Sequence, residues 1–78
     1  MIIEYLKGND WAAISDEKDI EPKLEGNKLI RIWRSEGLTR YIRKMKDRYI
    51  GIEWRQGIVT NEKSFNSASN VINWLLER

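Results

Sequence analysis

The chain has 78 residues, of which 41% are apolar and 33% are charged, and 14 basic against 12 acidic side chains leave a net charge of +2. A chain of this length buries about 60% of its unfolded surface and sustains one small core, without a deep substrate pocket. Because it contains no Cys and no His, disulfides, thiol nucleophiles, Ser-His-Asp triads and histidine metal sites are excluded.

These absences predict one small domain, residues 1–78, that is not an enzyme, holds no metal or cofactor and takes no small-molecule substrate. The apolar stretch at the N-terminus is interrupted by Glu4 and is too short for a signal-peptide core. No segment approaches the roughly 18 apolar residues of a membrane span. We therefore expect a cytoplasmic protein without a membrane partner.

The N-terminal region, residues 1–27, carries 3 basic and 7 acidic side chains, a net charge of −4. Residues 2–7 alternate as in a strand, and a turn at residues 8–10 follows. Residues 11–14 can extend a hairpin or begin a helix, and the hairpin is the preferred interpretation. Residues 15–27 include the only proline and are predicted to form an exposed loop.

The acidic residues of that loop allow two further hypotheses. They can bind a divalent cation, although the D-x-D-x-D-G order of a calcium loop is missing. They can also fold back over a basic surface and compete there with an anionic partner. A solvated loop is the preferred interpretation. The residues concerned are Asp16, Glu17, Asp19, Glu21 and Glu25.

The middle region, residues 28–60, is predicted to be a basic β-meander. Residues 28–57 carry 9 basic and 3 acidic side chains, a net charge of +6, and such asymmetry favours a polyanionic partner. Three runs, residues 28–34, 38–45 and 49–55, are rich in β-branched and aromatic residues with period-two alternation. A turn at Gln56-Gly57 leads to a fourth short run at residues 58–60.

The turns predict the register of the two hairpins. A three-residue loop, Ser35-Glu36-Gly37, places Ile30 opposite Ile42 and separates apolar from polar residues. A similar loop at residues 46–48 places Ile42 opposite Ile52. One face is then apolar and contains Ile30, Ile32, Leu38, Ile42, Ile50, Ile52 and Trp54. The other face contains Arg31, Trp33, Tyr41, Arg43, Met45, Tyr49, Glu53 and Arg55.

Three residues fit this scheme less simply. Arg40 and Lys44 fall on the apolar side, where we expect them at the margin with their charged ends extended to water. Gly51 falls opposite Arg43 and predicts a bulge or a close approach by another backbone.

The C-terminal region, residues 66–77, is predicted to be an α-helix capped by Ser67 or Asn66, with Phe65 packing back against it. Its apolar residues recur at helical spacing. The fold class is therefore α+β, an antiparallel β-sheet of three to five strands packed against one C-terminal α-helix.

The basic and aromatic face predicts a non-catalytic binding module for nucleic acid. Cations neutralise phosphates, and flat rings stack on bases. The order of strands followed by a helix is similar, in architecture alone, to small DNA-binding domains of integrases and plant transcription factors, and it assigns no site residue. The candidate nucleic-acid-binding residues are Arg31, Trp33, Tyr41, Arg43, Lys46, Arg48, Tyr49 and Arg55.

Three alternatives remain open. The same face can serve a small protein-binding module or inhibitor, with Trp33, Tyr41, Met45 and Tyr49 as anchors and the arginines as a rim. It can also be a solvated face without a partner. An exposed strand at residues 2–7 or 58–60 can pair between copies of the chain. The sequence distinguishes neither DNA from RNA nor one oligomeric state from another.

Overall fold

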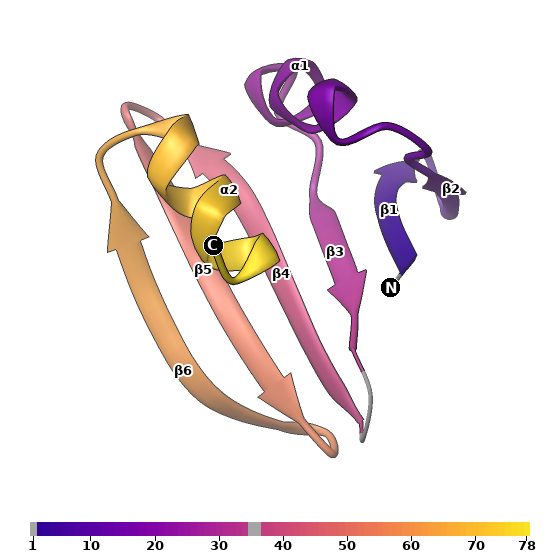
Figure 1. Ribbon diagram of the computed structural model, residues 1–78, viewed down its shortest axis with the longest axis vertical. Helices are drawn as coiled ribbons and strands as arrows, with labels where there is room; N and C mark the ends of the chain where they lie inside the picture. The colour runs from indigo at the N-terminus through magenta and orange to yellow at the C-terminus, as the bar shows by residue number, and fades with distance from the viewer. Residues whose placement is uncertain (1, 35–36) are drawn as a thin grey trace.

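The computed structural model describes residues 2–34 and 37–78, which form one antiparallel sheet with two α-helices (Figure 1). The sheet has the strand order β2-β1-β3-β4-β5-β6. The predicted α+β class is confirmed, but the sheet has six strands rather than three to five, and a second helix is present. The elements are β1 (Ile2–Lys7), β2 (Asp10–Ala13), a 3-10 turn η1 (Glu17–Asp19), α1 (Ile20–Glu25), β3 (Ile30–Trp33), β4 (Leu38–Met45), β5 (Arg48–Arg55), β6 (Ile58–Phe65) and α2 (Ala68–Leu76).

Both helices cover the same face of the sheet. Figure 1 shows α2 lying across β4 and β5, with α1 next to it at the top of the sheet. The fully buried side chains come from both helices and from the sheet face beneath them, and each contributes about 1.5–3 kcal/mol by leaving water. They are Ile20 and Leu24 of α1, Val71 and Leu75 of α2, and Ile30, Ile32 and Ile42 of the sheet.

The α1 segment corrects the prediction of an exposed loop at residues 15–27. Ile20 and Leu24 are four residues apart and both are fully buried. Pro22 lies in the first turn of the helix, where a missing N–H removes no helical hydrogen bond. The acidic segment packs on the helix-covered face, so the hypothesis that it closes over the opposite face is wrong.

The C-terminal helix begins where the sequence predicts. The Ser67 Oγ accepts a hydrogen bond of 3.1 Å from the backbone N–H of Asn70, which confirms the predicted N-cap. Phe65 precedes this cap and packs on Trp74, with ring centroids 5.7 Å apart.

The N-terminal hairpin is also confirmed, since β1 pairs with β2 through the turn at Gly8-Asn9. The other edge of β1 pairs with β3, so β1 is an interior strand. The hypothesis that residues 2–7 form an exposed strand is therefore wrong. The run at residues 58–60 belongs to β6, which extends to Phe65 and forms one edge of the sheet.

The predicted register of the β3–β4 hairpin is confirmed. Ile30 pairs with Ile42, and Arg31 pairs with Tyr41. Ile32 is fully buried beneath the helices, whereas Trp33 is 42% exposed on the other face. Of the loop predicted between the strands, only Gly37 belongs to the described residues, and its φ of 73° is left-handed as such a loop requires.

The predicted register of the β4–β5 hairpin is wrong by one residue. Its turn has two residues, Lys46 and Asp47, and Lys46 has a left-handed φ of 60°. Ile42 consequently pairs with Gly51 rather than with Ile52. A shift of one residue exchanges the two faces of a strand. Tyr49, Glu53 and Arg55 therefore lie on the helix-covered face, whereas Ile50, Ile52 and Trp54 lie on the opposite face.

Gly51 does not mark a bulge or a neighbouring backbone. It makes room for a side chain, because a Cβ at this position would come within 2.5 Å of the Trp74 ring. The bulge lies further along, where Glu53 pairs with Asn61 but Trp54 pairs with Val59. β6 thus contains one extra residue at that point.

Candidate functional site

The candidate site is the sheet face that neither helix covers, which we call the open face. Strand register assigns its residues, because directly paired residues share a face. They are Ile2, Glu4 and Leu6 of β1, Trp11 and Ala13 of β2, Arg31 and Trp33 of β3, Thr39, Tyr41, Arg43 and Met45 of β4, Arg48, Ile50, Ile52 and Trp54 of β5, and Val59, Glu62 and Ser64 of β6.

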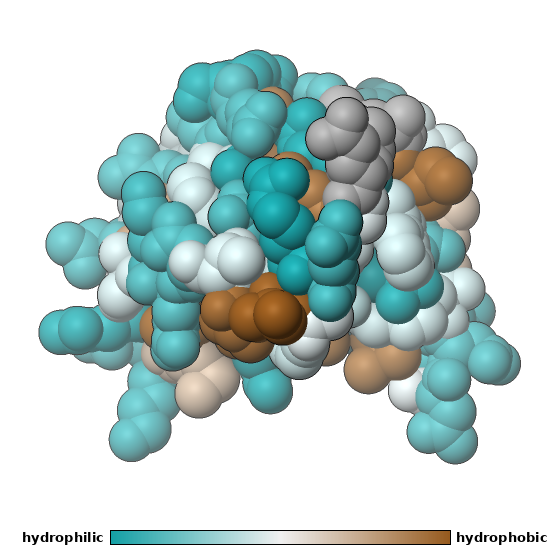
Figure 2. All heavy atoms as spheres, turned by 90° about the horizontal axis from the view of Figure 1, so that it is seen from below, coloured by the Kyte–Doolittle hydropathy of each residue, from teal (hydrophilic) through white to brown (hydrophobic). Residues whose placement is uncertain are grey.

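One end of the open face carries a line of exposed apolar side chains, which we call the apolar row: Ile2, Trp33, Trp54 and Val59. Pairing places them in line across the sheet, with buried Thr39 between the two tryptophans. Their exposed fractions are 57%, 42%, 37% and 48%. Figure 2 views the molecule from below and shows hydrophobic residues at the surface among hydrophilic ones.

A shallow groove of about 370 Å³ continues from the row toward the other end of the open face. Its lining is mostly apolar and includes the two charged residues Arg43 and Glu62. A second hollow, which shares Leu29, Tyr41, Arg43 and Ile52 with the first, extends the groove to Trp54. The apolar lining residues of the first groove include Leu29, Tyr41, Met45, Ile50 and Ile52.

Aromatic rings link distant strands across this face. The Tyr41 ring centroid lies 6.3 Å from that of Trp11 and 6.5 Å from that of Trp54. Trp11 is on β2, three strands away from β4, which is about 14 Å in a flat sheet. Curvature of the sheet and the length of both side chains close this gap, so the rings support one another in fixed positions.

Arg31, the first predicted phosphate ligand, is already occupied within the protein. Its guanidinium lies 3.7 Å from the Trp11 ring centroid, and its Nε donates a hydrogen bond of 2.8 Å to Glu4 Oε1. The Trp33 Nε1–H donates to the same oxygen at 2.8 Å. The hydrogen bonds from Trp33 and then Arg31 lower the pKa of Glu4. Glu4 therefore neutralises the charge of Arg31.

Arg43, Lys46 and Arg48 behave differently. Arg43 lies on the open face, and Lys46 and Arg48 lie at the β4–β5 turn. Within the described ranges 2–34 and 37–78, none of the three has an ion-pair partner within 4.0 Å. All three are exposed. Their charges are therefore available to a partner.

The other two predicted site residues lie on the helix-covered face. Tyr49 donates its hydroxyl hydrogen bond to Glu25 of α1, and this bond raises the pKa of Tyr49. Arg55 pairs with Leu38 at the end of β5. The structure thus brings Arg31, Trp33, Tyr41, Arg43 and Arg48 of the predicted site onto one face, with Lys46 at the adjoining turn, and separates Tyr49 and Arg55 from them. It adds six residues to this face. The predicted register had placed Ile50, Ile52 and Trp54 on the other face, and the sequence had assigned Ile2, Trp11 and Val59 to neither face.

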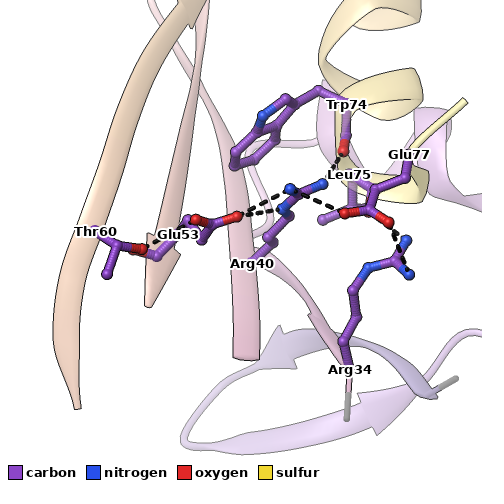
Figure 3. Close-up of polar contacts among 7 residues, drawn as sticks. All are labelled: Arg34, Arg40, Glu53, Thr60, Trp74, Leu75 and Glu77. Carbon is purple, nitrogen blue, oxygen red and sulfur yellow. Dashed lines mark hydrogen bonds and ion pairs between the residues drawn. The ribbon is translucent and has the colours of Figure 1, made fainter. Parts of the chain in front are cut away.

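Arg40 and Lys44 do not extend into water as predicted. Figure 3 shows Arg40 between Glu53 and the C-terminal end of α2. Its Nε donates to Glu53 at 3.0 Å, and one terminal nitrogen donates to the Trp74 carbonyl at 2.7 Å. The hydrogen bond from Arg40 is the main reason that the pKa of Glu53 is lowered. Lys44 contacts Glu25 at 2.9 Å. Both cations are paired within the protein and are not free for a ligand.

In the part of the chain that the structure describes, no three acidic side chains gather as a metal site. Neither α1 nor α2 has the length and hydrophobicity that crossing a bilayer requires. Comparison of the chain with protein-family models, with curated proteins and with solved structures gives no match.

Proposed function

We propose that the protein is a non-catalytic binding module that engages a protein partner through its open face. The apolar row carries this proposal, because Ile2, Trp33, Trp54 and Val59 are 37–57% exposed in one line across the sheet. Contiguous exposed apolar surface is typical of interaction sites. Tryptophan and tyrosine are enriched at the energetic centres of protein interfaces.

The groove beside the row supports the same function. Its apolar floor, together with rings held by neighbouring rings, offers a surface that needs little reorganisation on binding. Neutralisation of Arg31 by Glu4 removes a charge that would otherwise have to be desolvated in an apolar interface.

A protein partner is preferred to nucleic acid because the cations of this face are concentrated at the end opposite the exposed tryptophans, with Arg43 lining the hollow that extends to Trp54. Arg48 and Trp54 are six residues apart on β5, about 20 Å along the strand. Surfaces for single-stranded nucleic acid place cations beside the stacking rings. Here Arg31, the cation nearest to Trp33, is paired.

Site-specific photo-crosslinking tests this proposal. p-Benzoylphenylalanine replaces Trp54 on the open face in one variant and exposed Asn73 of α2 in a matched control. Both are irradiated in extract of the native cell. We expect a discrete protease-sensitive adduct from position 54 alone, retained at about 500 mM salt, where exposed charges are strongly screened. A nuclease-sensitive adduct, or equal labelling from both positions, would contradict the proposal.

A further inference from the structure

We infer that the open face binds an amphipathic α-helix that places apolar side chains on the apolar row and carboxylates at the opposite end of the face. This inference rests on the proposed function and adds the chemistry and orientation of the partner.

The two ends of the open face differ in character. The apolar row lies at one end, and four cations lie at the other, which we call the basic end: Lys28, Arg43, Lys46 and Arg48. Lys28 and Arg43 line the same hollow. None of the four has an ion pair within 4.0 Å in residues 2–34 and 37–78, and Asp47 is the acidic residue of the intervening turn. Glu62 of β6 lines the groove together with Arg43, and with both acids counted the four cations leave the basic end a net charge of about +2.

Other cations of the sheet, on both of its faces, are neutralised inside the protein. Arg31 contacts Glu4, Arg40 contacts Glu53, and Lys44 contacts Glu25, all within 3.0 Å. The basic end lacks such partners among residues 2–34 and 37–78, so a ligand that brings carboxylates there gains attraction without breaking an internal pair.

The groove connects the two ends and suits a helix. It presents an apolar path of about 20 Å, the length of roughly 13 helical residues. The opposite face of the same sheet already packs α2, a helix of 9 residues. A helix on the open face would cover the second side of the sheet, as in other layered α and β architectures.

A second copy of the chain fits this face poorly. A two-fold axis along the strands would bring the two basic ends together, and like charges in contact are unfavourable. A two-fold axis across the strands would lay each basic end on the apolar row of the other copy, where the cations would lose water without gaining a partner. A partner with separate apolar and acidic parts avoids both costs.

Peptide binding tests the inference. The probes are fluorescein-labelled 14-residue helical peptides with the same leucine face. Each carries four Glu or four Lys at one end, and each charge type is made in two forms, with the charges at the N-terminus or at the C-terminus. We expect one Glu peptide to bind the protein at least about tenfold more tightly than its Lys counterpart. Arg43→Gln combined with Arg48→Gln should abolish this preference. The control, Lys18→Gln combined with Lys63→Gln, changes charge outside the open face and should leave the preference for the Glu peptide unchanged.

The apolar end is tested with Trp33→Ala combined with Trp54→Ala, after circular dichroism shows that the variant folds. This variant should weaken the binding of the Glu peptide and of the Lys peptide by similar factors. Equal binding of both peptides, or no binding at millimolar concentration, would overturn the inference. The proposed function would still stand if position 54 gave its protein adduct. It would fall if the crosslinking failed as described above.

Sedimentation analysis of the protein without peptide tests whether a second copy of the chain binds the open face. We expect a monomer at about 100 μM. A dimer that the combined Trp33→Ala and Trp54→Ala variant dissociates would show that another copy occupies the face, and the inference would be wrong.

Discussion

Gly51 of β5 lies directly beneath the indole ring of Trp74 in α2. A Cβ at position 51 would come within 2.5 Å of Cζ3 and 2.8 Å of Cε3 of that ring. The indole therefore occupies the space that a side chain would fill. This contact positions Trp74, whose carbonyl accepts the hydrogen bond from Arg40.

Gly51→Ala should destabilise the protein by about 1–3 kcal/mol, because the added methyl group forces the large ring to move. Urea denaturation measures this loss. Gly26→Ala is the matched control, since its φ is −81° and the nearest atom to its added Cβ is 3.4 Å away. In a protein that already carries Trp74→Leu, Gly51→Ala should lower the free energy of unfolding by less than it does in wild type. An equal cost in both backgrounds would show that Trp74 is not the obstacle.

The same contact explains why the register of the β4–β5 hairpin could not be predicted. Ile50, Ile52 and Trp54 alternate with polar residues, and alternation normally identifies the buried side of a strand. In this sheet the open face is also apolar, so both registers give a plausible pattern. The two registers differ in whether a glycine lies beneath the Trp74 ring, which has no room for a side chain there. This requirement is visible only after α2 has been placed on the sheet.

Elements with one apolar side were predictable. The α2 helix and the β3–β4 hairpin each have a single set of residues that fits the core, so period and turn suffice. In α1 the signal was present in the spacing of Ile20 and Leu24, but Pro22 and the surrounding acids favoured a loop.

The candidate site was only partly predictable. Trp33, Tyr41 and Arg43 follow from the confirmed hairpin. The neutralisation of Arg31 does not, because Glu4 is 27 residues away and the pairing of β1 with β3 was undetermined by pattern.

Arg40→Met should cost about 1.5–3 kcal/mol of unfolding free energy, since it removes charge-assisted hydrogen bonds to Glu53 and to the Trp74 carbonyl. The Arg40 side chain is 12% exposed, so water replaces these partners poorly. Urea denaturation near pH 7 gives the value. Arg43→Met removes an exposed arginine that has no ion pair with the described residues and should change stability by less than about 0.5 kcal/mol. A similar effect of the two substitutions would contradict the assigned role of Arg40.

The contribution of this pair should depend on pH. The pKa of Glu53 is lowered in the folded protein from its ordinary value of 4.5, chiefly by the Arg40 hydrogen bond. Its stabilisation is therefore fully present above about pH 4.5 and is lost as the pH falls through the folded-state pKa. We expect the stability difference between wild type and Arg40→Met to shrink from pH 7 to pH 3. A difference that stays constant over this range would show that Arg40 does not act through the Glu53 carboxylate.

Leu24→Ala tests whether α1 belongs to the core. Leu24 is fully buried, so the truncation should cost about 2–5 kcal/mol, a large part of the stability of a domain of this size. Thermal and urea denaturation measure the loss. Glu21→Ala, at an exposed position of the same helix, should stay within about 0.5 kcal/mol of wild type. A small effect of Leu24→Ala would restore the interpretation of residues 15–27 as a loop.

Neutralisation of Arg31 by Glu4 predicts how the protein responds to nucleic acid. Fluorescence anisotropy with labelled single- and double-stranded oligonucleotides, between about 50 and 200 mM salt, gives the slope of log K against log salt. Each neutralised phosphate of a duplex contributes about −0.9 to this slope. We expect a slope for wild type no steeper than about −3.6, the contribution of the four cations of the basic end, because Arg31 and Arg40 are paired inside the protein. Glu4→Gln should release Arg31 and steepen the slope by about one, and a second change, Arg31→Gln, should reverse that effect. A wild-type slope of about −4.5, as five free cations would give, together with no change in the slope on Glu4→Gln, would contradict this prediction. The open face would then be a nucleic-acid surface.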